Sequence, residues 1–174
     1  MPQTEMTCHS PATEQAPDDA SRIALIGSPN GGKTSIFNQL TGLHAKTGNY
    51  PGVTVSRSEG VARIHDHTFA IEDLPGTYSL SPISPDEQVV VDVLDGRMDQ
   101  VSAPDALVVV ADATALRRSL LLLAEVLPRH LPTAVVVTMT DELRRRQGSL
   151  DATALSQALG VPVVAVVANR GIGI

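Results

Sequence analysis

The sequence has few aromatic residues, a single cysteine and no long hydrophobic run. Only 2% of its 174 residues are aromatic and tryptophan is absent, so the core must be built from Val, Leu, Ile and Ala. Cys8 stands alone and cannot form an internal disulfide, which fits a reducing compartment. No apolar run approaches the roughly 18 residues of a membrane-spanning helix, and the first residues lack the apolar core of a signal peptide.

Positive charge is scarce as well. Lys33 and Lys46 are the only lysines, and 13 basic side chains stand against 19 acidic ones, which gives a net charge of −6. A nucleic-acid backbone is bound by basic surface, so this balance speaks against nucleic acid as a partner. With 43% hydrophobic and 18% charged residues, a chain of this length indicates one globular domain with a sizeable core.

The most informative stretch is residues 27–34, which read Gly-Ser-Pro-Asn-Gly-Gly-Lys-Thr. It fits G-x-x-x-x-G-K-[ST], the phosphate-binding loop between a strand and a helix, and the apolar patterns at 23–26 and 35–40 predict that strand and helix. Glycines let successive N–H groups and the helix N-terminus face an anion. Lys33 would then reach the β- and γ-phosphates and the Thr34 hydroxyl would bind Mg²⁺. A chance glycine-rich turn is the alternative.

A second motif, Asp73-Leu74-Pro75-Gly76, follows a pair of strands predicted at about 58–64 and 68–73. In phosphate-loop NTPases an Asp at a strand end holds Mg²⁺, and a Gly shortly after it offers its N–H to the γ-phosphate. Asp-x-x-Gly alone is a weak signal, because any exit from a strand into a turn can match it. Its place 39 positions after Thr34, behind a hairpin, makes it a second indication of the same site.

The rest of the chain alternates helices and strands. Residues 1–21 read as a disordered leader, and 44–57 as a long polar loop. Helices are predicted at 86–94, at 114–127 with Thr114 as its cap, and at 150–159; strands are predicted at 106–111, 134–137 and 161–167. This rhythm predicts an α/β fold, a three-layer, doubly wound, mostly parallel sheet with one antiparallel edge strand. The ligand should lie at the carboxyl ends of the strands.

Taken together, the motifs resemble a Ras-like P-loop GTPase domain, and more closely the N-terminal G domain of the bacterial ferrous iron transporter B family (FeoB). Three segments carry this resemblance: Gly-Ser-Pro-Asn-Gly-Gly-Lys-Thr-Ser-Ile-Phe-Asn-Gln-Leu-Thr-Gly from residue 27, Gly-Asn-Tyr-Pro-Gly-Val-Thr-Val from residue 48, and Asp-Leu-Pro-Gly-Thr-Tyr-Ser-Leu from residue 73. The resemblance covers about 22–174.

The resemblance implies a domain organisation and a location. Such a domain binds GTP or GDP on the cytoplasmic side of the bacterial inner membrane and is itself soluble, attached to a helical domain and an Fe²⁺ permease. The chain stops at Ile174, where a Ras-like domain needs one more helix, so we expect a piece of a longer membrane protein that lacks this helix, the helical domain and the permease. A homo-oligomer is left open.

The resemblance also assigns roles to matching positions. Thr34, Thr54 and Asp73 would hold Mg²⁺, with Thr54 closing as the switch I threonine only when a γ-phosphate is present. Asp73 and Gly76 would begin switch II. Many Ras-like proteins have Gln directly after this Gly to orient the attacking water; here Thr77 stands there, so unassisted hydrolysis should be slow.

A potassium ion would compensate for the missing glutamine, because the family resembles the cation-activated GTPases in which K⁺ takes the place of an arginine finger. Asn30 and the backbone carbonyls of residues 48–52 would hold this ion. The alternative is that Asn30 is only a loop residue that tolerates an unusual backbone conformation. The catalytic residues expected are thus Asn30, Lys33, Thr54 and Gly76.

Recognition of the base departs from the family pattern. The family's Asn-x-x-Asp is Thr138-Met139-Thr140-Asp141 here, and its Ser-x-Arg-Gly is Ala168-Asn169-Arg170-Gly171. Asp141 can still accept from guanine N1 and N2, whereas Thr138 has a shorter reach than Asn. We expect weakened affinity, with relaxed guanine preference and some ATP binding or hydrolysis as an open alternative. The full set of nucleotide contacts implied is Ser28, Pro29, Asn30, Gly31, Gly32, Lys33, Thr34, Ser35, Asp73, Gly76, Thr138, Met139, Asp141, Ala168, Asn169 and Arg170.

The leading hypothesis is an Mg²⁺-dependent GTPase that regulates or drives Fe(II) uptake. One rival is a nucleotide-binding sensor with negligible hydrolysis, favoured by the missing Gln and the altered base motifs. Another is a ribosome-associated or tRNA-modifying GTPase, against which the acidic charge and the segment at 73–80 speak.

Overall fold

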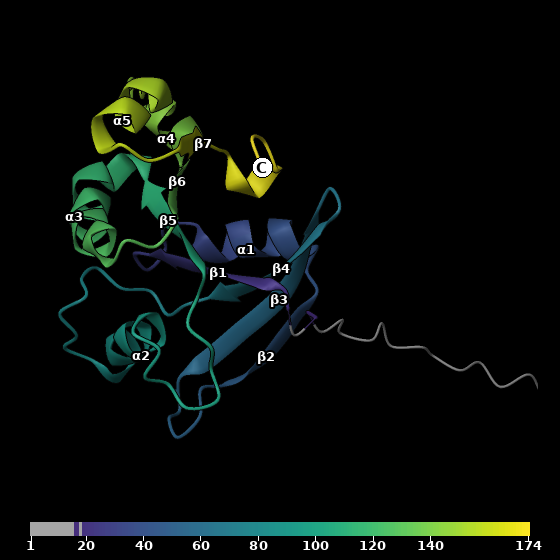
Figure 1. Cartoon of the computed structure of the whole chain (residues 1–174). Helices are drawn as coiled ribbons and strands as arrows, with labels where there is room; N and C mark the ends of the chain where they lie inside the picture. The colour runs from purple at the N-terminus through teal and green to yellow at the C-terminus, as the bar shows by residue number, and fades with distance from the viewer. Residues whose placement is uncertain (1–15, 18) are drawn as a thin grey trace, which may run out of the picture.

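The structure is a computed structural model that describes residues 16, 17 and 19–174. Most of the predicted leader, 1–21, lies outside the described residues. Along the chain (Figure 1) the elements are β1 (Ser21–Gly27), α1 (Lys33–Thr41), β2 (Ala45–Asn49), β3 (Ser56–Ile64), β4 (His67–Asp73), α2 (Pro85–Leu94), β5 (Ala106–Asp112), η1 (Ala113–Ala115), α3 (Leu116–Val126), η2 (Leu127–Arg129), β6 (Thr133–Thr138), α4 (Thr140–Arg145), α5 (Ala152–Leu159), β7 (Val163–Ala165) and η3 (Ala168–Arg170).

One seven-stranded sheet runs in the order β2-β3-β4-β1-β5-β6-β7. β1 pairs in parallel with β4 and β5, and β5, β6 and β7 continue in parallel, whereas β3 is antiparallel to both of its neighbours. The predicted α/β class with a mostly parallel sheet is confirmed. The antiparallel strand lies one place in from the edge, because β2 pairs outside it.

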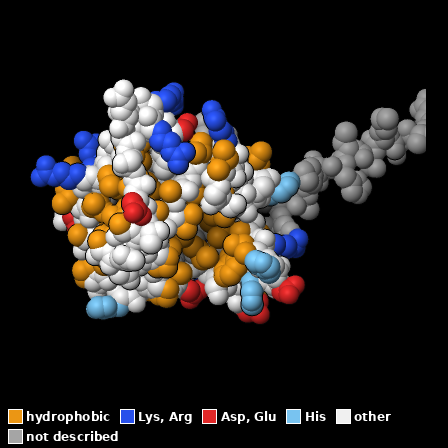
Figure 2. Space-filling view, turned by 90° about the horizontal axis from the view of Figure 1, so that it is seen from above, with side chains coloured by type: hydrophobic (Ala, Val, Ile, Leu, Met, Phe, Trp, Pro, Cys, Tyr) orange, Lys and Arg blue, Asp and Glu red, His pale blue; other side chains and the backbone are white. Residues whose placement is uncertain are grey.

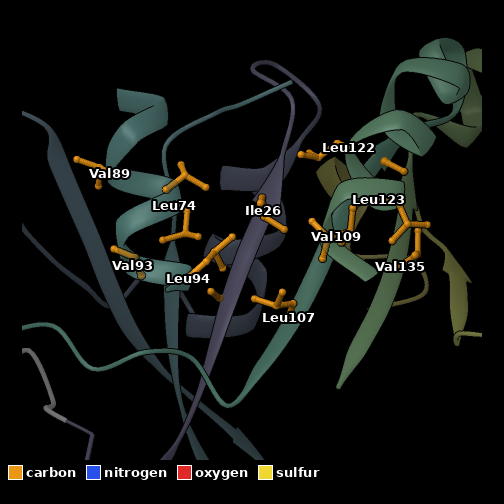
Figure 3. Close-up of a cluster of buried hydrophobic side chains, with 14 of the residues drawn as sticks. Ile26, Leu74, Val89, Val93, Leu94, Leu107, Val109, Leu122, Leu123 and Val135 are labelled. Carbon is orange, nitrogen blue, oxygen red and sulfur yellow. The ribbon is translucent and has the colours of Figure 1, made fainter. Parts of the chain in front are cut away.

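Side chains of the central strands alternate between two apolar clusters, one on each face of the sheet. Ile26 and Val109 belong to the cluster under α2 and α3 (Figure 3), whereas Leu25 and Val110 lie in the cluster under α1 with Phe37. The four strand side chains are at most 1% exposed. Since successive residues of a strand point to opposite faces, a strand between two helical layers is apolar along its whole length. This is the reason for the continuous apolar runs in the sequence.

Local signals fix where the helices begin and end. α2 starts with Ser84, whose hydroxyl accepts from the Glu87 N–H at 3.3 Å, followed by Pro85 in the first turn. α5 is capped by Asp151 and ends at Gly160, which has a left-handed φ of 70°. Both helices agree closely with the predicted ranges.

Three local predictions were wrong in detail. Residues 45–49 form the edge strand β2 instead of a loop, because their backbone pairs with β3 despite weak strand formers such as Gly48 and Asn49. Thr114 does not cap a helix: its N–H and hydroxyl both donate to Asp112 Oδ1 at 2.7 Å within η1, and α3 begins at Leu116. The last strand covers only Val163–Ala165.

The face seen from above has a mixed surface. Figure 2 shows hydrophobic side chains gathered in a hollow there, while Lys and Arg side chains are spread out instead of forming one basic patch. Among the residues described, none of the helices has the length and apolar character needed to cross a bilayer. A further helix over the sheet, expected from the resemblance, stays a prediction.

Candidate functional site

The loop between β1 and α1 has the backbone of an anion cradle. Asn30 and Gly32 have left-handed φ angles of 61° and 86°, a region that favours Gly and tolerates Asn. The Gly31 N–H donates to the Ser28 carbonyl oxygen at 3.2 Å, which closes the turn. At Gly27 a Cβ would lie 2.5 Å from the Val110 carbonyl oxygen, so the first glycine is required by the close approach of β5.

Three side chains that the two motifs predicted together do meet at the end of this loop. The Lys33 ammonium, in a residue only 8% exposed, donates to Asp73 Oδ1 and to the Leu74 carbonyl oxygen. The Thr34 hydroxyl donates to Asp73 Oδ2 at 3.0 Å. A carboxylate and a hydroxyl side by side are hard oxygen donors of the kind that bind Mg²⁺, so these residues fit that ion.

The segment after Asp73 lies against β1 and the phosphate loop. The Thr77 N–H donates to the Gly27 carbonyl oxygen at 3.0 Å, and a Cβ on Gly76 would lie 2.9–3.0 Å from Pro29 atoms. Thr77 is fully buried, and its hydroxyl donates to the Ser79 carbonyl oxygen at 2.6 Å. The side chain at 77 therefore turns into the protein, and Gly76 is the residue that faces the loop.

A cavity of about 600 Å³ opens above these residues, at the carboxyl ends of β1 and β4. It gathers most of the predicted phosphate contacts in one place. Its lining consists of Ser28, Pro29, Asn30, Gly32, Lys33, Thr34, Ser35, Gly76, Asp86 and Met139. Sequence reasoning missed Asp86, although its place in the first turn of α2, soon after the Asp-x-x-Gly motif, was a usable signal.

A smaller cavity of about 170 Å³ adjoins the first and shares Gly32, Ser35 and Met139 with it. The other residues of its lining are Thr138, Asp141, Glu142, Arg145 and Ala168. Arg145 Nη2 lies 3.6 Å from Asp141 Oδ2 and 2.7 Å from Glu142 Oε2. Glu142 and Arg145 were missed; the spacing of four residues between Asp141 and Arg145 on one helix would have placed both on the same side.

Thr138 is fully buried at the end of β6 and contacts the phosphate loop directly. Its hydroxyl lies 2.6 Å from the Gly31 carbonyl oxygen and 3.2 Å from that of Ala111, and its one proton can serve either acceptor. A Cβ on Gly32 would lie 3.3 Å from Thr138 Cγ2. Thr138 therefore contacts the phosphate loop, and its short reach toward the base stays a prediction.

Several of the predicted contacts line neither cavity, among them Gly31 and Asp73, although Asp73 bonds to Lys33 and Thr34. Thr54 lines a separate hollow of about 480 Å³ together with Gly52, Val53, Val55 and Pro85. Of η3, only Ala168 lines the smaller cavity; Arg170 is exposed and lines neither. For Asn169 the structure describes the backbone within η3 alone.

Comparison with known proteins connects this geometry to a family. The family model described as "Ferrous iron transport protein B" matches residues 21–174. The chain belongs to the FeoB family. It is 43% identical over 152 residues to the Fe(2+) transporter FeoB of Leptospira biflexa and 45% identical over 157 residues to that of Salmonella typhimurium. Each match covers 87% of this chain but only 21% and 20% of those proteins, so the chain spans about a fifth of their length.

Solved FeoB structures have the same fold. The G domain of the T. maritima FeoB iron transporter matches with a TM-score of 0.78 and 39% identity, covering 88% of this chain and 91% of that one. The cytosolic domain of the same transporter in its GMPPNP form matches with a TM-score of 0.81 and 38% identity, covering 88% of this chain and 59% of that one. The FeoB G-domain fold is thus shown by sequence and by structure.

Proposed function

We propose that this domain binds guanine nucleotide with Mg²⁺, hydrolyses GTP, and in the full-length protein regulates Fe(II) uptake by an attached permease. The observation that carries the proposal is the meeting of Lys33, Thr34 and Asp73 at one end of a cavity whose neighbour contains Asp141. Phosphate chemistry at one end and a guanine acceptor at the other match the two ends of GTP.

The residues of this chain would divide the work as follows. The loop N–H groups and the N-terminus of α1 would hold the β-phosphate, and the Lys33 ammonium would turn from Asp73 and Leu74 toward phosphate oxygens. Thr34 and Asp73 would hold Mg²⁺, which would supply positive charge against the negative charge of the phosphates. The Gly76 N–H would face the γ-phosphate, because Gly76 lines the same cavity.

Slow hydrolysis without K⁺ follows from the position of Thr77. Its side chain is fully buried and bonded to Ser79, so it would not orient an attacking water. Asn30 lines the phosphate cavity and could hold K⁺ with the carbonyls of residues 48–52. Its positive φ equally suits a residue that serves only the turn, and the K⁺ assignment stays a prediction.

The link to iron transport is supported by the relatives alone. Those from Leptospira biflexa and Salmonella typhimurium are named Fe(2+) transporters, and T. maritima structures are described in GDP and GMPPNP forms. From the same likeness we propose that the domain lies on the cytoplasmic side of the inner membrane, ahead of helical and permease domains. The described residues themselves contain no cluster of three or more His, Cys, Asp or Glu side chains suited to a metal ion.

A second candidate is relaxed base specificity, with ATP accepted beside GTP. It is favoured by the direction of the Thr138 hydroxyl, which lies against the Gly31 and Ala111 carbonyls and is buried away from the base. Asp141 would then be the main side chain that distinguishes guanine from adenine, and Arg145 competes for its carboxylate.

The experiment that tests the proposal is a calorimetric titration of GTP, GDP and ATP with Mg²⁺, followed by single-turnover hydrolysis. Lys33→Ala should abolish measurable binding, whereas Lys46→Ala should not, because Lys46 is exposed on the edge strand β2. Absence of GTP and GDP binding would refute the proposal, ATP affinity equal to that of GTP would refute guanine specificity, and binding without turnover would favour the alternative of a nucleotide-binding sensor.

A further inference from the structure

A buried carboxylate that takes no part in the proposed chemistry lies directly before Asp73. The Glu72 side chain is 6% exposed and accepts from the Tyr50 hydroxyl and from Arg57 Nε, both at 2.9 Å. Arg22 Nη2 lies 3.5 Å from its other oxygen, and Glu59 binds Arg22 and Arg57 at 3.2 and 3.0 Å. A buried charge destabilises a fold unless it is paired on its open sides, as Glu72 is here.

Tyr50 also closes the loop formed by residues 50–55. Its N–H donates to the Val55 carbonyl oxygen at 2.9 Å, and its own carbonyl oxygen accepts from the Val53 N–H at 3.3 Å. Tyr50 and Val55 are 1% and 7% exposed and pack in the larger apolar cluster. The loop therefore has a base that is held by the core and by Glu72.

The tip of the same loop is free in comparison. Gly52 has a φ of 77° and nothing within 4 Å of a built Cβ, and Thr54 is exposed. Thr54 lies in the hollow beside Pro85 and not in the phosphate cavity, so it would have to move to reach Mg²⁺. If the base of the loop stays fixed and only its tip moves, the base determines where Thr54 can go.

The register of β4 connects this base to the metal end of the site. Glu72 and Asp73 are adjacent in one strand, so their side chains point to opposite faces of the sheet. Asp73 faces Lys33 and Thr34, while Glu72 faces Tyr50. β4 thus carries Asp73, a proposed Mg²⁺ ligand, and Glu72, which anchors the loop that contains Thr54, another proposed Mg²⁺ ligand.

We propose that Glu72 is a positioning residue: through the Tyr50 hydroxyl it fixes the base of the 50–55 loop to β4, so that only the tip carries Thr54 toward the γ-phosphate. This inference rests on the proposed GTPase function. GDP has no γ-phosphate for Thr54 to approach, so the anchor should matter for GTP turnover and not for GDP affinity.

The matched test uses the two tyrosines of the chain, Tyr50 and Tyr78. Tyr50→Phe keeps the ring in the core and removes only the hydroxyl; it should lower kcat for GTP roughly tenfold, the worth of one hydrogen bond to a charged group, with GDP affinity unchanged. Tyr78→Phe, an exposed residue whose ring lies 5.0 Å from the Arg118 guanidinium, is the control and should behave as wild type. Glu72→Gln, which keeps an acceptor oxygen for Tyr50, should lose less than Tyr50→Phe.

A second readout needs no hydrolysis. In Tyr78→Phe protein, Tyr50 is the only tyrosine and tryptophan is absent, so the emission of the protein reports Tyr50 alone. The fluorescence of a phenol that is hydrogen-bonded to a carboxylate is weak. Binding of GDP or of a non-hydrolysable GTP analogue should leave this weak fluorescence unchanged. The second substitution Glu72→Ala, made in the Tyr78→Phe protein, should raise it.

The outcomes separate the inference from the function beneath it. The inference is overturned if the Tyr50→Phe protein folds and keeps the wild-type kcat, or if it loses GDP and GTP affinity equally. In either case, GTP turnover by the wild type still supports the proposed GTPase function. If the wild type binds but does not hydrolyse GTP, the proposed enzyme fails, and the emission decides: a rise on binding the GTP analogue means that the base moves and overturns the anchor.

Discussion

The Thr138 hydroxyl lies 2.6 Å from the carbonyl oxygen of Gly31, across 107 positions of sequence. This contact joins the end of β6, where the base is expected, to the loop that would hold the phosphates. Because Thr138 is fully buried, its polar atom has no access to solvent and serves the fold directly. Thr138 thus braces the loop at the position where the resemblance implies an asparagine.

Thr138→Val should test this brace, because it keeps the shape and removes the hydroxyl. The Gly31 and Ala111 carbonyls would lose this donor, so we expect a loss of about 1–3 kcal/mol in the free energy of unfolding. GTP and ATP affinity should fall by the same factor, since the loop serves both. Urea unfolding and calorimetry measure the two effects; a fall in GTP affinity alone would show that Thr138 reads the base.

Thr138→Asn is the complementary change. A longer amide can reach both the loop and the base, so we expect GTP affinity to rise relative to ATP affinity. The ratio of the two dissociation constants is the measurement, and an unchanged ratio would remove Thr138 from the explanation of specificity.

Gly76→Ala should disturb the contact between the segment after Asp73 and the phosphate loop. The new Cβ would lie within 3.0 Å of Pro29 backbone atoms, which cannot move aside as a side chain tip can. We expect a loss of about 1–3 kcal/mol in stability and, from a displaced loop, a fall in kcat on the order of 10²-fold. In Gly48→Ala, where nothing lies within 4 Å of the Cβ, thermal stability should stay near wild type; equal stability of the Gly76 variant would contradict the contact.

Tyr50 should make stability fall at alkaline pH. Burial, then the charge of Glu72 and the hydrogen bond to it, raise the pKa of the Tyr50 phenol well above its usual value near 10. The folded protein keeps the proton that the unfolded chain releases, so this contribution is complete below pH 10 and declines above it, by up to about 1.4 kcal/mol per pH unit. Urea unfolding between pH 9 and about 11 should show a steeper decline in wild type than in Tyr50→Phe; equal slopes would mean that Tyr50 ionises freely.

GTP turnover should be faster in K⁺ than in Na⁺ if Asn30 helps to hold a cation where an arginine finger would be, a finger being worth about 10³–10⁵-fold. Asn30→Ala should remove the difference between the salts. Equal rates in both salts for the wild type would refute the K⁺ assignment and leave Asn30 as a residue of the turn.

The sequence predicted the parts of this molecule that depend on short spacing. The phosphate loop and Asp73 were found because their chemistry is written in consecutive residues, and the buried strands because their runs are wholly apolar. β2 was missed because Gly48 and Asn49 disfavour a strand until β3 supplies a partner. Asp86 and Arg145 carry local signals, the first turn of α2 and the four-residue spacing from Asp141, but the cavity that each one lines depends on the placement of α2 and α4.

Tertiary contacts also place several of the predicted residues elsewhere than the sequence suggested. Thr138 was expected at the base and is buried against the loop. Thr54, expected near Mg²⁺, lies beside Pro85. Glu72 drew no attention in the sequence, because its role depends on Tyr50, Arg22 and Arg57 arriving from other strands and a loop.

The place of β1 in the sheet has a consequence for the order of folding. β2, β3 and β4 pair as neighbours in sequence, whereas β1 pairs with β4 and β5, which follow it only after long intervening segments. Contacts between distant segments form late because long loops have to close first. The phosphate loop leaves directly from β1. The chain should therefore gain its ligand-binding ability late in folding, after the hairpins of the sheet have formed.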